Sequence, residues 1–170
     1  MIVFEERLGE LVDVLPPHIN TATATEFPIK YGWGTQDELN KYLALPRQDS
    51  PYPLIWLING TDKENLSAHE VRRQTQLLIA TVSDKQSEMN PFIYQTDYKD
   101  VLVPVLENLI QCFTQSGISQ IVRNEIERKF LPNFSVRENN GEIDIWNVIS
   151  LDLELAISDN SCINEIFFNN

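Results

Sequence analysis

Histidine, cysteine, glycine and positive charge are all scarce in this chain of 170 residues. It has two histidines, two cysteines and six glycines, and its 25 acidic residues outnumber 13 lysines and arginines, which gives a net charge of −12. No apolar run approaches the ~20 residues that a membrane-spanning helix needs. The sequence therefore predicts no membrane partner. It also predicts no specific nucleic-acid recognition, because binding to the phosphate backbone needs clustered lysine and arginine.

The scarcity of histidine and cysteine also limits the available chemistry. His18 and His69 lie in polar segments, and Cys112 and Cys162 are far apart, so no metal-ligand spacing and no nucleophilic triad stands in the sequence. Two free thiols are expected rather than a disulfide. The Gly-Trp-Gly at residues 32–34 lacks the third glycine and the lysine of a phosphate-binding loop. We therefore predict no enzyme activity, no cofactor and no metal.

Length and composition predict a single domain. A chain of this size with 42% hydrophobic residues can bury a substantial core. We expect one domain over residues 1–158, followed by a C-terminal tail or extra edge strand over residues 159–170. The first ten residues, MIVFEERLGE, are acidic where a secretion signal is basic, so we expect a protein made and kept in the cytoplasm.

Periodicity predicts three helices. An apolar stripe with helical spacing lies within residues 2–15, and a capping box, Thr-Gln-Asp-Glu, precedes a second helix over residues 35–45. A third helix is predicted from residue 97 to about Gly117. Residues 118–126 are ambiguous and compatible with another short helix.

Strand patterns occupy most of the remaining chain. They are predicted over residues 27–33, 54–58, 70–82, 130–137, 143–150 and 151–157, with Asn-Asn-Gly at residues 139–141 as a hairpin turn. Residues 18–26 are predicted to be an extended connection, and residues 59–69 a polar loop that projects from the surface. This order predicts an α+β fold, a mostly antiparallel sheet with helices packed on one face and a long projecting hairpin or loop.

Carboxylates on the predicted final strands raise the question of a magnesium site. Asp152 and Glu154 share one face of a strand, and Asp144 is expected across the preceding strand. Glu127 and Lys129 have the Glu-x-Lys spacing of a restriction-type nuclease core, but the element before them has a helical pattern, where that core needs a strand. A solvated acidic face is the favoured interpretation.

Tryptophan and arginine mark candidate contact surfaces. Trp33, Trp56 and Trp146 each fall in a predicted strand, where core packing is the ordinary role and an interface anchor the alternative. Arg72 and Arg73, at the polar start of the long strand, either pair with an acidic neighbouring subunit or solubilise the hairpin.

The order of elements carries a resemblance to a known family. A first helix, a proline-entered apolar strand (Tyr-Pro-Leu-Ile-Trp-Leu, residues 52–57) and a long returning strand over residues 73–82 form one half. A helix over residues 97–113 and a terminal antiparallel pair form the other. This arrangement, over roughly residues 1–158, resembles the small tail-terminator and neck proteins of tailed bacteriophages.

The resemblance implies a virion structural protein, assembled in the host cytoplasm. Proteins of this family form a ring, usually a hexamer, that caps the tail tube and joins it to the head, so the implied partners are further copies, the tail tube and neck or connector proteins. DNA would pass through such a ring, and an acidic lumen would let it slide. The positions expected at subunit contacts are Asn59, Thr61, Lys63, Arg72, Arg73, Asp152 and Glu154.

Two other functions stay open at this point. Small acidic α+β proteins without catalytic residues also act as inhibitors or immunity proteins that mask a basic partner. A magnesium-dependent nuclease built on the carboxylates is the more distant alternative.

Overall fold

The computed structural model describes residues 2–20, 23–44, 53–83, 91, 94–139, 142–159 and 162–168, with side chains except at 44, 135–139 and 142–144. Within this part the chain forms a single α+β domain built on a mostly antiparallel sheet. The predicted fold class is therefore confirmed.

The described helices fall on the three helical segments that the sequence predicts, although the third segment begins at Tyr94 and not at residue 97. Their bounds are Phe4–Asp13 (α1), Gln36–Ala44 (α2), Tyr94–Leu102 (η1, a π-helix) and Val103–Gln115 (α4), which directly follows η1. The capping box before α2 forms as predicted: the Thr35 backbone N–H donates to Glu38 Oε2 over 2.7 Å, and the Glu38 N–H donates to Thr35 Oγ1 over 3.2 Å. None of the described helices is long and apolar enough to cross a membrane.

The main sheet is a mixed sheet with one parallel contact. The strands are His18–Asn20 (β1), Thr25–Phe27 (β2), Lys30–Gly34 (β3), Leu54–Ile58 (β4), Asp62–Asn65 (β5), Glu70–Ser83 (β6), Ser119–Asn139 (β7) and Glu142–Ser158 (β8). In the main sheet the order is β3-β4-β6-β8-β7, and β5 pairs with the first residues of β6. Only β3 and β4 run parallel there, and β1 and β2 form a separate antiparallel pair.

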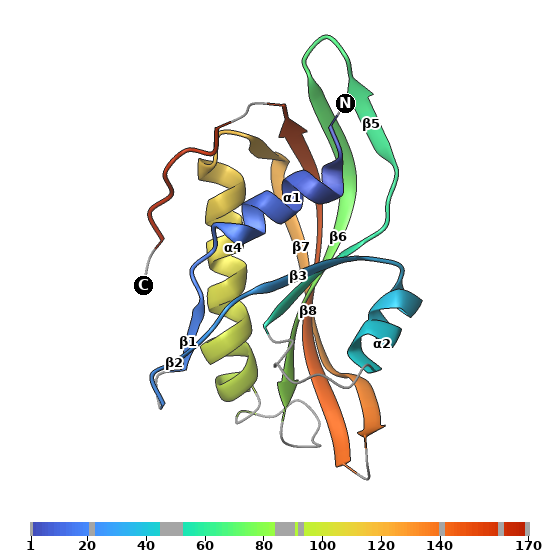
Figure 1. Ribbon diagram of the computed structural model, residues 1–170, viewed down its shortest axis with the longest axis vertical. Coiled ribbons are helices and arrows are strands. Elements are labelled where there is room, and N and C mark those ends of the chain that lie inside the picture. Colours follow the sequence, from blue (N-terminus) through green and yellow to red (C-terminus); the bar gives the residue numbers. More distant parts are fainter. Residues whose placement is uncertain are drawn as a thin grey trace.

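The sheet is covered on both faces, but unequally (Figure 1). The first face packs against α1, η1 and α4 in the main core, which includes the odd-numbered residues Ile149 to Ile157 of β8. The second face forms a smaller core with α2, through Leu39 and Leu43. The prediction that the helices pack on one face is thus wrong for α2, because Trp56 and Trp146 point to the second face and need apolar cover.

The longest strands are longer than their sequence patterns indicate. Residues 118–126, compatible with a helix by sequence, lie mostly within β7. The segments 143–150 and 151–157, predicted as separate strands, form one strand, β8. No glycine or proline interrupts residues 142–158, and side chains are buried without a break from residue 145 to residue 151. β7 and β8 pair on either side of the predicted turn, with Asn139 opposite Glu142; residues 140 and 141 of that turn lie outside the described part.

The segment predicted as a polar loop, residues 59–69, contains strand β5. Asp62 to Asn65 pair with Arg73 to Glu70. The turn that follows is fixed by Asn65, whose Oδ1 accepts hydrogen bonds from the backbone N–H groups of Ser67 and Ala68 at 3.1 and 3.2 Å. An Asn side chain in this position replaces the backbone bonds of a turn. Similarly, the predicted extended connection over residues 18–26 contains β1 and the start of β2.

Candidate functional site

The second face of the sheet changes character halfway along β6 and β8. Toward one end, Leu78, Ala80, Trp146 and Val148 are buried with α2. Toward the other end the side chains are polar or charged, and no described helix packs on them. We call this second region the open half; its residues are Arg72, Gln74, Gln76, Glu127, Lys129, Asp152 and Glu154.

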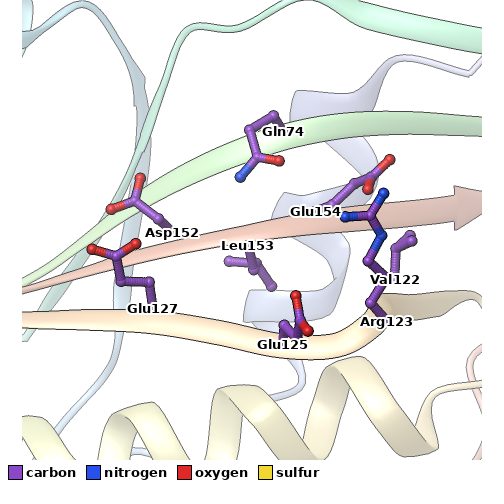
Figure 2. Close-up of a pocket in the computed structure, with 8 residues that line it drawn as sticks. All are labelled: Gln74, Val122, Arg123, Glu125, Glu127, Asp152, Leu153 and Glu154. Atoms are coloured by element: carbon purple, nitrogen blue, oxygen red, sulfur yellow. The ribbon is translucent and has the colours of Figure 1, made fainter.

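Strand register brings the carboxylates of the open half together. Asp152 lies between Gln76 on β6 and Glu127 on β7, and Glu154 lies opposite Gln74. The side chains of Asp152 and Glu154 project to the same side of β8, as the sequence predicted (Figure 2). They line a shallow depression of about 190 Å³ together with Gln74, Val122, Arg123, Glu125, Glu127 and Leu153.

An irregularity in β7 shapes one wall of this depression. The pairing with β8 shifts between Ile121 and Ile126, so extra residues of β7 oppose β8 there. Arg123 and Asn124 both have positive φ values, 63° and 53°. The side chains of Arg123 and Glu154 point toward one another across the depression, and Glu125 lies beside them (Figure 2). The irregularity thus places the positively charged Arg123 and the negatively charged Glu125 beside the open half.

Ion pairs at the margins of the open half partly neutralise it. Lys129 Nζ lies 2.9 Å from Glu127 Oε1. The hydrogen bond to Glu127, together with the negative charges of Glu127 and Asp152, raises the pKa of Lys129. On β6, Arg72 Nε lies 2.5 Å from Glu70 Oε1, and this bond raises the pKa of Arg72 with a smaller contribution from Glu154. The open half therefore carries both signs of charge, with carboxylates in excess.

The carboxylates considered as a magnesium site, the less favoured alternative, do not assemble around Asp144. Asp144 and Asp152 are eight positions apart on the same strand, which at ~3.4 Å per residue separates their Cα atoms by roughly 27 Å. Within the described residues no group of three or more His, Cys, Asp or Glu side chains is arranged to hold a metal ion. The helix expected before Glu127, which counted against a nuclease core, is also wrong, since that segment is a strand.

Arg72 and Arg73 have opposite environments, although they were predicted together as contact residues. The Arg73 side chain is 3% exposed; its Nε lies 2.5 Å from Asp62 Oδ1, its Nη1 lies 2.7 Å from Glu5 Oε1, and its guanidinium covers the Phe4 ring. Burial lowers the pKa of Arg73, but the hydrogen bonds to Asp62 and Glu5 outweigh it, and the pKa lies above its ordinary value. Arg73 therefore holds α1, β5 and β6 together inside the fold, and Arg72 remains at the surface.

The other predicted contact residues lie at the base and along the side of the β5–β6 hairpin. Asn59, Thr61 and Lys63 are exposed, and Lys63 lies directly opposite Arg72. Among the three tryptophans, only Trp33 is exposed, at 55%. Apart from the buried Arg73, the predicted contact residues thus form two groups. One lies on the β5–β6 hairpin and comprises Asn59, Thr61, Lys63 and Arg72; the other is the carboxylate pair Asp152 and Glu154.

A buried polar network was missed by the sequence reasoning. Asn147 is 1% exposed on the first face; its Oδ1 accepts from the Asn133 backbone N–H over 3.0 Å, and its Nδ2 donates to Asp97 Oδ2 over 2.6 Å. Asn133 has a φ of 53° and lies at the second irregularity of β7. Asn147 interrupts the apolar odd-numbered series from Ile145 to Ile157, and that interruption is the signal that marks it.

Comparison with known proteins does not assign the chain to a family. No family model matches the chain, and no curated protein sequence matches it significantly.

Proposed function

We propose that this chain is a non-enzymatic structural protein of a tailed-bacteriophage virion, which forms a ring at the neck end of the tail, caps the tail tube and joins it to the head. The order of elements that carries the family resemblance supports the proposal: α1, then β4, the long returning β6, the helix η1–α4 and the antiparallel pair β7–β8. The partners would be further copies of the chain, the tail tube and a neck or connector protein.

The observation on which the proposal chiefly rests is the open half. It is a broad, charged sheet surface on strands of 14, 21 and 17 residues. The depression within it, about 190 Å³, is smaller than the roughly 300–1,000 Å³ of a usual small-molecule site. A wide, shallow surface does not enclose a small substrate, whereas its charges of both signs can pair with complementary charges on another protein surface.

The test is the mass of the purified protein by light scattering across a concentration series, with and without isolated tail tubes. A ring-sized mass, or a monomer that becomes a ring only on tubes, is the expected result. A monomer at every concentration that does not respond to tubes would overturn the proposal.

A second candidate function is an inhibitor or immunity-type protein that covers a basic partner. The observation that favours it is the excess of carboxylates around the depression, where Glu125, Glu127, Asp152 and Glu154 meet Arg123 and Lys129. Such a protein would stay monomeric and form a 1:1 complex with its partner, whereas the ring requires self-association. The same light-scattering series, with a basic candidate enzyme added, distinguishes the two.

A further inference from the structure

The last described segment, residues 162–168, lies against the main core although it belongs to no strand or helix. We call it the C-terminal arm. Ile163, Ile166 and Phe168 pack against the core, and the Asn164 N–H donates to the Ser116 carbonyl oxygen over 2.8 Å. The arm passes the C-terminal end of α4 (Figure 1). Its contacts are thus mainly apolar.

The chain provides a seat for the arm at the junction of α4 and β7. Gly117 has a φ of 75°, and a Cβ atom placed on it would lie 2.4 Å from Asn164 Nδ2 and 3.0 Å from Asn164 Cγ. A side chain at position 117 would therefore meet the Asn164 side chain and require it to move, and the positive φ favours glycine there. The end of β8 is fixed to the same junction, because the Ser158 N–H donates to the Ile118 carbonyl oxygen over 2.8 Å. We call residues 116–118 the seat.

Two properties of the arm indicate that it contacts another copy of the chain. Its outer side carries Phe167, which is 75% exposed next to the half-buried Phe168 and beside the exposed polar residues Asn164 and Glu165, so one large apolar side chain of the arm faces solvent. Within the described residues a single backbone–backbone hydrogen bond joins it to the seat. The same apolar surface is present on every copy of the chain. The arm can therefore make the same contacts on a neighbouring copy, which is the condition for domain swapping.

We propose that in the assembled ring the arm of each copy occupies the seat of a neighbouring copy. This inference rests on the ring proposed above. The stretch that joins β8 to the arm, residues 158–161, reads Ser-Asp-Asn-Ser, a composition typical of connections. Ile163 follows Asp159 by four residues, so it reaches at most ~14 Å from the end of β8. The neighbouring seat must therefore lie beside that end, which places the subunit contact at this corner.

A trapped disulfide tests the exchange. Gly117→Cys and Asn164→Cys, combined with Cys162→Ser, place two thiols at the contact between residue 117 and the arm, where a Cβ at residue 117 lies 3.0 Å from Asn164 Cγ. Because Cγ is one bond of ~1.5 Å from the Cβ of residue 164, the two Cβ atoms lie at most ~4.5 Å apart, within the ~3.5–4.5 Å that a disulfide spans. Cys112 does not compete, because it is fully buried and its burial raises the pKa of its thiol to about 12. After oxidation of the ring, a denaturing gel without reductant should show covalent chains of two or more copies.

Single-copy products from an oxidised ring would overturn the exchange. The matched controls carry only one of the two new cysteines, and products that they share with the double variant do not count as evidence for exchange. If the positive φ at residue 117 prevents folding of the variant, a chain ending at Asp159 replaces it. Exchange predicts that this chain, monitored by its thermal unfolding, folds but loses ring-sized mass; a full ring without the arm would overturn the inference.

The outcomes separate this inference from the proposed function. A wild-type ring whose oxidised variant gives only single-copy products leaves the ring proposal intact and overturns the exchange alone. A wild-type chain that stays monomeric with and without tail tubes overturns the ring, and the exchange with it.

Discussion

The two ends of the strand pair β6–β8 differ in how many of their faces are covered. At one end, residues 78–82 of β6 lie beside residues 146–150 of β8, with the main core on the first face and α2 on the second. At the other end, residues 72–76 lie beside residues 152–156, with the main core on the first face and the open half on the second. The same two strands thus form a doubly covered end and an open end.

This difference determines which positions of β6 and β8 are constrained by packing. At the doubly covered end, consecutive side chains such as Trp146 and Asn147 are both buried, so each of them contributes to stability. At the open end, Ala156 is buried, but the other even-numbered side chains are polar or charged and are exposed on β6 or half-buried on β8. We therefore expect the proposed contact with a partner to lie at the open end.

The largest predicted effect comes from the doubly covered end. Trp146 is 2% exposed, and Trp146→Ala should lower the free energy of unfolding by about 3–5 kcal/mol, because it removes a large buried side chain and leaves a cavity. Denaturant unfolding measures the change. The matched control is Gln76→Ala, an exposed residue on the same sheet face at the open end, for which we expect less than about 0.5 kcal/mol. Equal losses for the two variants would contradict the comparison.

The second largest effect is predicted on the covered face of the open end. Arg73→Ala leaves Glu5 and Asp62 without their buried cation. Removing one partner of a buried pair costs ~3–5 kcal/mol, and the partial exposure of these carboxylates reduces the expected loss to about 2 kcal/mol. Hydrogen exchange should show faster exchange of the β5 amides, which lose the tie through Asp62. Arg72→Ala is the control, and a comparable loss from it would show that burial does not distinguish the two arginines.

A smaller loss is expected from the polar network of the doubly covered end. Asn147→Ala removes the acceptor of the Asn133 N–H and the donor to Asp97. An unsatisfied buried polar group costs ~1–3 kcal/mol, and we expect about 1–2 kcal/mol here, because Asp97 is only half-buried. Thermal unfolding measures the loss. The control is Asn164→Ala on the exposed arm, and an unchanged stability of Asn147→Ala would mean that the network does not fix the bulge of β7.

Local patterns in the sequence predicted the elements whose neighbours in sequence decide their structure. The capping box at residues 35–38 depends on four residues and forms as predicted. The apolar strand β4 and the long β6 are recognised by composition, and the alternation of residues 151–157 places Asp152 and Glu154 on one face. These features needed no knowledge of tertiary contacts.

The features that the sequence did not reveal all depend on contacts between distant residues. The bulges of β7 exist because β8 continues to pair on both sides of them, and local patterns cannot show this pairing. Arg73 is buried only because Glu5 and Asp62, 68 and 11 positions away, approach it. Likewise, Arg123 and Glu125 line the depression in a segment where Arg123 and Asn124 have positive φ values, which are uncommon for residues other than glycine. The candidate site is thus determined by which strands pair with one another, and not by the local secondary-structure propensity of its residues.

The smallest effect on stability is predicted at the open end, where the largest effect on function is expected. Asp152→Asn with Glu154→Gln should change the free energy of unfolding by less than about 0.5 kcal/mol, because both side chains lie on the uncovered face and their replacements keep their shape. If the open half lines the lumen of the proposed ring, the loss of repulsion should increase the retention of DNA in ring-capped tubes. The control is Gln74→Ala, which changes the same surface without changing its charge. If stability, assembly and DNA retention are all unchanged, the carboxylates of the open half do not line the lumen of a ring. Binding to a basic partner would then be the remaining explanation for them.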